Sequence, residues 1–156
     1  MDARRSLKTR KMKNIFIICS FLFCTLSLSA QEKNDAWYVN FDEAAKLSMK
    51  TNKPILANFT GSDWCGWCIR LKKGVFSKDE FKDWAEENFV LLEADFPRGQ
   101  PTLGDAKEIK KRVGGDVRGY PTILFLDAEG KVKGKSGYMK GGPASWVKNA
   151  DKFTRS

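Results

Sequence analysis

Apolar and polar positions predict alternating strands and helices over residues 37–156. A nearly continuous apolar run from Ile55 to Thr60 follows Pro54, which is typical of a central strand buried on both faces. Turn residues bound four other short apolar or alternating runs, which are predicted strands at 37–39, 89–96, 122–126 and 131–137. The last two are joined by the turn 127–130, which favours a hairpin.

Helical spacing of apolar residues predicts five helices. The first is expected to be capped by Asp42, and the third is expected to open with a capping box at 77–80. The helices are predicted to follow Asp42, to run from Cys65 to 73 or 74, from 77 to about 88 and from 105 to 113, and to begin again at Pro143. Strand, helix, strand, helix, hairpin and helix in this order indicate an α/β protein whose first half needs a parallel crossover.

The first thirty residues have the charged, apolar and small-residue order of a secretory signal. Residues 2–13 carry six basic residues against one acid, and residues 15–30 are apolar or small. We expect cleavage after Ala30, which leaves one domain over residues 31–156 in the periplasm or outside the cell. An uncleaved membrane anchor is the alternative, but the apolar run falls short of the roughly 20 residues that a spanning helix needs. Met12 is a second possible start that gives the same mature chain.

Removal of this leader changes the charge and the cysteine count. The chain holds 28 basic and 19 acidic residues; the leader accounts for six and one, so the mature chain carries 22 and 18, a net charge of +4. The remaining charges alternate in sign, so nothing points to nucleic acid or to a membrane surface. One cluster of basic residues is interpreted as the solvated face of a helix: Lys107, Lys110, Lys111 and Arg112. Cys19 and Cys24 leave with the leader, which excludes a framework of structural disulfides.

The two remaining cysteines, Cys65 and Cys68, form a Cys-Gly-Trp-Cys segment directly after the predicted central strand. At i and i+3 on the first turn of a helix, the two thiols lie on one face, close enough to form a disulfide. The pair can therefore cycle between dithiol and disulfide. A metal site is not expected, because the chain has no histidine and no second cysteine pair, and no other cofactor is expected.

Two motifs together resemble the thioredoxin superfamily: Trp64-Cys65-Gly66-Trp67-Cys68 after a strand, and Gly119-Tyr120-Pro121-Thr122 before a hairpin. The segment 60–65 is similar to the secreted bacterial thioredoxin-like proteins of thiol-disulfide interchange. The segment 117–123 is similar to the corresponding loop of protein disulfide isomerase domains. The resemblance covers essentially the whole mature chain. It implies a thioredoxin-like α/β fold with a central mixed β-sheet flanked by helices.

The resemblance also implies roles for individual residues. Cys65 is the attacking thiol and Cys68 the resolving one; the helix start, where backbone N–H groups are unpaired, favours a Cys65 thiolate. Pro121 is cis in the family and faces the cysteine pair, and the Tyr120 backbone offers hydrogen bonds to an extended substrate. The expected substrate-binding residues are Trp64, Gly66, Trp67, Tyr120 and Pro121. Of the two tryptophans, Trp64 is expected to be half in the core, and Trp67 is the better candidate for substrate contact.

The sequence departs from the family at a buried aspartate that accepts a proton from the inner thiol. Asn58 stands at that position and cannot titrate, and the aspartate's lysine neighbour aligns near Leu91, so both buried charges are expected to be lost. The chain also has no histidine to stabilise a Cys65 thiolate, and Asp63 disfavours a second negative charge nearby. These features favour a reductase or isomerase over an oxidase.

We therefore expect a monomeric thiol-disulfide oxidoreductase that acts on protein dithiols and disulfides and receives electrons from a membrane or periplasmic donor. The rival hypothesis is a non-catalytic peptide-binding or chaperone-like module in which the disulfide between Cys65 and Cys68 is structural. A bond that closes so short a loop adds little stability, so catalysis is favoured. Neither hypothesis involves nucleic acid or stable membrane insertion after the signal is cleaved.

Overall fold

The computed structural model describes residues 37–154. At its centre lies strand β1 (Ile55–Thr60), all six residues of which are buried. β1 pairs in parallel with β2 (Val90–Asp95) and antiparallel with β3 (Thr122–Leu126), and β3 pairs antiparallel with β4 (Val132–Ser136). The strand order β2-β1-β3-β4 confirms the predicted mixed sheet.

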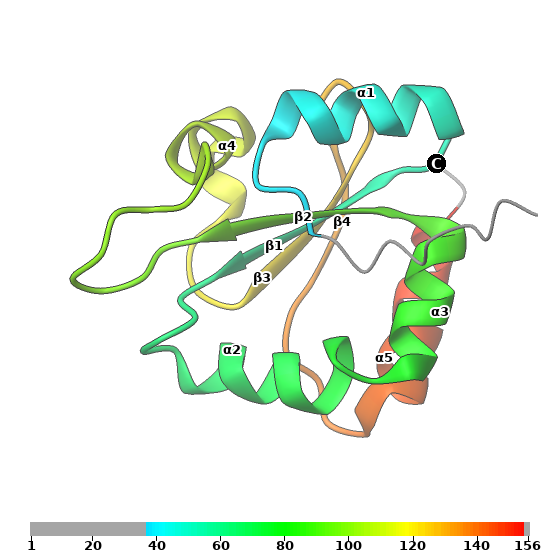
Figure 1. Ribbon diagram of the computed structural model, residues 1–156. Coiled ribbons are helices and arrows are strands. Elements are labelled where there is room, and N and C mark those ends of the chain that lie inside the picture. Colours follow the sequence, from blue (N-terminus) through cyan, green and yellow to red (C-terminus); the bar gives the residue numbers. More distant parts are fainter. Residues whose placement is uncertain (1–36, 155–156) are drawn as a thin grey trace, which may run out of the picture. The chain divides into compact units, whose positions relative to one another are not determined.

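Helices cover both faces of this sheet. In chain order they are α1 (Phe41–Thr51), α2 (Gly66–Leu71), the π-helical turn η2 (Lys72–Phe76), α3 (Asp79–Asn88), α4 (Ala106–Val113), the 3-10 turn η3 (Gly114–Asp116), α5 (Gly142–Ala150) and the 3-10 turn η4 (Asp151–Phe153). α1 and α4 lie on one face of the sheet, and α2, α3 and α5 lie on the other (Figure 1). This arrangement is the α/β fold with helices on both faces that the sequence predicts.

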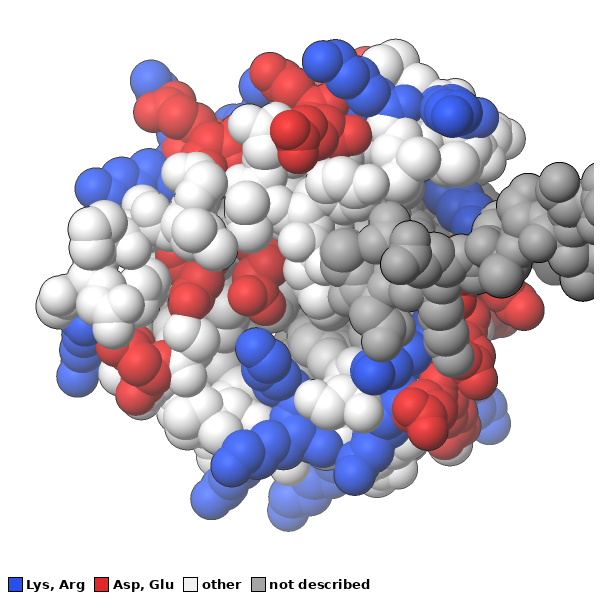
Figure 2. Space-filling view, in the orientation of Figure 1, with Lys and Arg blue, Asp and Glu red and all other residues white. Residues whose placement is uncertain are grey.

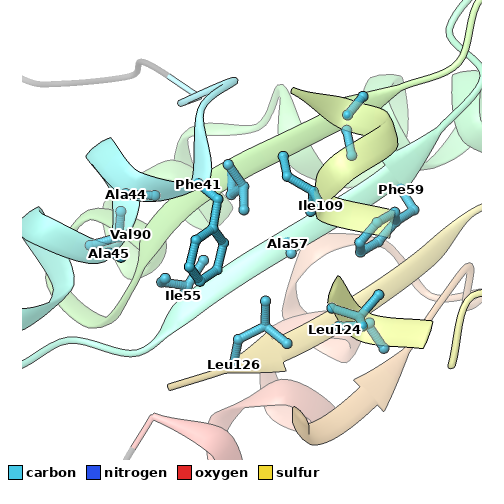
Figure 3. Close-up of a cluster of buried hydrophobic side chains, with 14 of the residues drawn as sticks. Phe41, Ala44, Ala45, Ile55, Ala57, Phe59, Val90, Ile109, Leu124 and Leu126 are labelled. Carbon is cyan, nitrogen blue, oxygen red and sulfur yellow. The ribbon is translucent and has the colours of Figure 1, made fainter. Parts of the chain in front are cut away.

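The alternation of side chains along β1 divides the core into two parts. Ile55, Ala57 and Phe59 point to the face that α1 and α4 cover, where they pack with apolar side chains from both helices (Figure 3). Leu56 belongs to the cluster on the opposite face. Asn58 follows Leu56 by two residues and therefore lies on that same face, which α2 covers.

Trp146 of α5 is fully buried in the second cluster. Its ring meets Phe76 and Phe81 edge-on, with 5.4 and 5.5 Å between centroids, and its indole N–H donates to the Gly137 carbonyl at 3.0 Å. Each aromatic pair contributes about 0.5–1.5 kcal/mol beyond the burial of its area. This packing attaches α3 and α5 to η2, and so holds the helix that begins with the cysteines against the sheet.

Several predicted boundaries agree closely with the structure. The strands predicted at 55–60 and 122–126 have these bounds, and α4 begins one residue after the predicted start at 105. The helix with the cysteines runs beyond 74, because it continues as the π turn to Phe76. The strand predicted at 37–39 is reduced to a single bridge between Tyr38 and Leu92.

Both predicted helix caps are wrong. α1 is capped by Asn40, whose Oδ1 accepts a first-turn N–H at 3.0 Å, and Asp42 lies inside that turn. The residue before α3 is Lys78, which makes no side-chain cap. Ser77 cannot open a capping box, because its N–H donates to the Lys72 carbonyl at 2.9 Å and so ends the preceding π turn.

Within residues 37–154, no helix is long and apolar enough to cross a bilayer. The predicted secretory signal, residues 1–30, lies outside the described residues. Its cleavage, and a mature domain that begins at residue 31, stay predictions.

Candidate active site

A tight turn leads from β1 into the helix of the cysteines. The Gly61 carbonyl accepts the backbone N–H of Cys65 at 2.9 Å. The Trp64 indole lies directly against Gly61, where a Cβ atom would overlap it. Cys65 is extended (φ −85°, ψ 100°) and is the N-cap of α2. Cys65 therefore lies at the start of the helix, where the sequence predicts it.

A disulfide joins Cys65 and Cys68, with an S–S distance of 2.07 Å. The backbone N–H of Cys68 donates to the Cys65 Sγ at 3.2 Å. A sulfur that accepts an N–H at a helix start is stabilised when it carries negative charge. The two residues are 6% and 4% exposed, so the expected contrast between an outer and an inner cysteine is small in this disulfide form.

Trp64 connects the turn before the cysteines to two other loops. Its indole N–H donates to the Phe96 carbonyl at 2.8 Å, and its ring meets Tyr120 edge-on with 5.7 Å between centroids. The Arg98 guanidinium lies over the same indole, 4.5 Å from its centroid. At 36% exposed, Trp64 is half in the core, as expected.

Trp67 is the more accessible of the two tryptophans, at 50% exposed. Its ring lies 4.8 Å from that of Tyr138, and the Arg70 guanidinium lies 4.7 Å from its centroid. A Cβ atom on the neighbouring Gly66 would meet no other atom within 4 Å. Gly66 and Trp67 therefore form an open surface beside the disulfide, with an aromatic ring available to a bound chain.

The peptide bond between Tyr120 and Pro121 is cis, as the resemblance implies. The Tyr120 side chain turns into the protein: its hydroxyl accepts from the Lys110 ammonium at 2.8 Å, and its ring lies 5.5 Å from that of Phe96. Lys110 is therefore only partly solvated, which corrects the interpretation for this residue; the other three members of the cluster are exposed: Lys107, Lys111 and Arg112. The contact between Tyr120 and Trp64 brings the loop of Pro121 beside the cysteine turn.

On the α2 side of the sheet, an amide and a carboxylate lie next to each other. Asn58, 5% exposed, pairs in register with Glu93 of β2, and its Nδ2 donates to the Glu93 Oε2 at 3.3 Å. This register corrects the expectation that Leu91 stands beside Asn58 and that both buried charges are lost, because a carboxylate is present. Burial raises the pKa of Glu93 above its ordinary value; the Lys72 charge opposes this shift, Asp95 adds to it and the Asn58 hydrogen bond opposes it.

The helix of the cysteines is strongly basic. Residues 66–78 contain Arg70, Lys72, Lys73 and Lys78 and no acidic residue. Figure 2 shows basic side chains gathered along the lower edge of the view, where α2 lies. A positive field beside the disulfide favours a thiolate at Cys65. Asp63 acts against this field, although its carboxylate oxygens accept the Arg98 backbone N–H at 3.0 and 3.1 Å.

Comparison with known proteins agrees with this geometry. Residues 41–147 match the thioredoxin-like domain family. The disulfide bond reductase DsbH of Chlamydia pneumoniae is 37% identical over 110 residues, which cover 69% of this chain and 66% of the relative. The thiol:disulfide interchange protein DsbD of Vibrio vulnificus is 32% identical over 100 residues, which cover 62% of this chain and 16% of the relative. The solved structure of a DsbH oxidoreductase has a TM-score of 0.69 at 33% identity, over 77% of this chain and 84% of that chain.

Fold, cysteine pair and family match define the class: the chain belongs to the thioredoxin-like domain family. Its relatives place it with the bacterial thiol:disulfide interchange proteins of the thioredoxin superfamily. The chain spans slightly less than two thirds of the DsbH relative and a much smaller part of DsbD.

Proposed function

We propose that this protein is an extracytoplasmic thiol-disulfide reductase that passes two electrons from the Cys65 and Cys68 thiols to disulfides in other proteins. The observation that carries the proposal is the Cys65 Sγ at the start of α2, bonded to its resolving partner and 3.2 Å from the Cys68 N–H. A relative named as a disulfide bond reductase supports the direction of electron flow. The signal predicted at residues 1–30 supports a periplasmic or secreted location.

The reaction starts from the reduced pair. The Cys65 thiolate attacks one sulfur of a substrate disulfide, the substrate S–S bond breaks, and the other substrate sulfur leaves as a thiolate that takes a proton from water. Cys68 then loses its proton and attacks the Cys65 Sγ of the mixed disulfide. The bond between Cys65 and the substrate breaks, and the second substrate thiol is released. The remaining disulfide is reduced again by the dithiol of an electron donor, which we expect to be a membrane or periplasmic protein.

The accessible surface beside Cys65 suits an extended substrate chain. Gly66 leaves open space next to the sulfur atoms, and Trp67 offers half of its ring to solvent. The Tyr120 side chain is engaged with Lys110 and Trp64, so its contribution to substrate would come from its backbone. We therefore propose a substrate-binding surface made of Gly66, Trp67, the Tyr120 backbone and Pro121.

Reduction of insulin by dithiothreitol tests the proposal with the mature protein. We expect the parent to accelerate this reaction and the Cys65→Ser variant to lose the acceleration. The rival hypothesis of a peptide-binding or chaperone-like module makes the opposite prediction. If a variant without both cysteines were as active as the parent, the reductase assignment would be wrong.

The roles of the two cysteines are tested by trapping. After mixing with an oxidised substrate, Cys68→Ser should stall as a mixed disulfide through Cys65, whereas Cys65→Ser should form none. Mass spectrometry of each mixture detects the adducts. Adducts through Cys68 alone would reverse the assignment of attacking and resolving thiols.

A further inference from the structure

Glu93 is a half-buried carboxylate on the face of the sheet that α2 covers. The side chains of β2 alternate: Val90, Leu92 and Ala94 belong to the core under α1 and α4, whereas Leu91 packs in the opposite cluster. Glu93 follows Leu91 by two residues and therefore shares its face. Figure 1 shows α2 beneath the carboxyl-terminal halves of β1 and β2, the part of the sheet that holds Glu93.

The buried side of α2 places Cys68 toward this part of the sheet. Cys68 and Leu71, at i and i+3, are the buried residues of α2, and Leu71 packs in the cluster on this face. Lys72, one helical turn after Cys68, acts electrostatically on Glu93. Glu93 therefore lies on the face of the sheet toward which the buried side of α2, with Cys68, is turned.

Asn58 holds this carboxylate and has unused hydrogen-bonding capacity of its own. Its Nδ2 donates to Glu93, but its buried Oδ1 accepts no hydrogen bond from the described part of the chain in the disulfide form. A buried acceptor without a donor costs stability, so this oxygen is a site for a hydrogen-bond donor. Cys68, a buried residue of the helix on this face, carries such a donor once the disulfide is reduced.

We propose that Glu93 accepts the proton of Cys68 in the resolving step and that Asn58 positions its carboxylate. This assignment rests on the proposed reductase function. The Cys68 S–H bond breaks and its proton moves to a Glu93 carboxylate oxygen. The resulting thiolate attacks the Cys65 Sγ, the bond between Cys65 and the substrate breaks, and the substrate sulfur leaves with the electron pair. Glu93 then returns its proton to the leaving thiolate or to water, and is a carboxylate again.

The surroundings of Glu93 suit this exchange. Burial disfavours the thiolate of an inner cysteine, so an adjacent base is needed near neutral pH. Burial also raises the pKa of Glu93, which makes the carboxylate a better proton acceptor than an exposed one, while Lys72 limits that shift. The groups that face Glu93 are Lys72 from the helix, Asp95 from its own strand and Asn58 from β1. Because Glu93 is only half-buried, it can exchange its proton with solvent.

The two chemical steps can be timed separately with the chromogenic disulfide dithiobis-nitrobenzoate. Attack by Cys65 on this reagent releases one coloured thiolate, and resolution by Cys68 releases the second. We expect Glu93→Gln, which keeps the shape and the polar contact to Asn58, to slow the second release by about tenfold or more near neutral pH. The first release should stay within about twofold of the parent. The difference between variant and parent in the rate of the second release should shrink toward about pH 9, where solvent alone deprotonates more of Cys68.

A matched control is Glu87→Gln, which removes an exposed carboxylate on α3; both releases should keep the rates of the parent. If Glu93→Gln resolves at the rate of the parent at every pH, the assignment of Glu93 is wrong and the reductase function stands. If Cys68→Ser still gives a second release, the reductase mechanism itself fails. A structural defect in Glu93→Gln would slow both releases together, at every pH, and would also overturn the assignment.

A measurement on the unmodified protein is independent of how the variant folds. The Glu93 carboxyl is followed by carbon-13 NMR through a pH titration in the dithiol and disulfide forms. A group that exchanges a proton with Cys68 should titrate differently in the two forms. Identical titration curves would rule out the contact that the proposal requires.

Discussion

Replacing Trp64 by alanine should destabilise the protein, because Trp64 joins three loops around the cysteines. The variant loses the hydrogen bond to the Phe96 carbonyl, worth about 0.5–1.5 kcal/mol net, and the edge-on contact with Tyr120, worth a similar amount. It also loses the contact with the Arg98 guanidinium, about 0.5–1 kcal/mol at an exposed site. We expect the free energy of unfolding to fall by about 2–3 kcal/mol in total, which lowers Tm by about 10 °C for a domain of this size.

The matched control is Trp67→Ala. Trp67 is half exposed, makes no hydrogen bond like that of Trp64, and keeps only the ring contact with the partly buried Tyr138 and the contact with the exposed Arg70, so the same truncation should cost less, about 1–2 kcal/mol. Its effect should fall instead on KM for insulin reduction. Thermal unfolding of the oxidised proteins, followed by far-ultraviolet circular dichroism, measures both variants without relying on tryptophan emission. An equal loss of stability in the two variants would refute the distinction between a structural and a substrate-facing tryptophan.

Two further variants test the turn and the redox poise. Gly61→Ala places a methyl group in the Trp64 ring and should lower the free energy of unfolding by about 1–3 kcal/mol. Gly66→Ala enters open space at a helical position and should not lower the midpoint of denaturant unfolding. A harmless Gly61→Ala would contradict the close packing. The reduction potential of the pair, from equilibration with glutathione, should lie nearer about −270 mV than about −120 mV, because the chain has no histidine to stabilise a Cys65 thiolate and Asp63 opposes the basic side chains of the helix. Trp67→His should raise this potential, and a parent value above about −180 mV would oppose the reductase direction.

The parts of the structure that the sequence predicts well have local causes. β1 is a continuous apolar run bounded by Pro54 and the turn at Gly61, so its bounds follow from residues within or beside it. The helix start at Cys65 follows in the same way from the turn before it. The different exposures of Trp64 and Trp67 follow from their places before and inside that helix.

Features that depend on residues far apart in the chain cannot be predicted from local sequence. The register between β1 and β2 sets Asn58 beside Glu93 rather than Leu91, and no residue near either strand fixes a parallel register. Asn40 caps α1 in part because Asp105, far along the chain, accepts the Phe41 N–H and contacts the Asn40 amide. A signal was nevertheless present: Glu93 follows Leu91 by two residues in β2, and a glutamate on the face that must pack against a helix is unusual.

Glu93 should also make the free energy of unfolding depend on pH, with a sign opposite to that of most carboxylates. Its pKa is raised in the folded state above the ordinary value of 4.5, because burial penalises the charged form. The stability that this group contributes is therefore fully present below pH 4.5 and is lost as pH rises through the folded-state pKa. Near neutral pH the charged Glu93 thus costs stability, and Glu93→Gln should unfold at a higher denaturant concentration than the parent, with the difference shrinking toward about pH 4. Urea titrations of both proteins near pH 7 and pH 4 measure this, and a variant that is less stable than the parent at neutral pH would contradict the reasoning. We therefore expect Glu93→Gln to be more stable than the parent and to resolve mixed disulfides more slowly. Replacing a residue that serves only the fold would not produce both effects together.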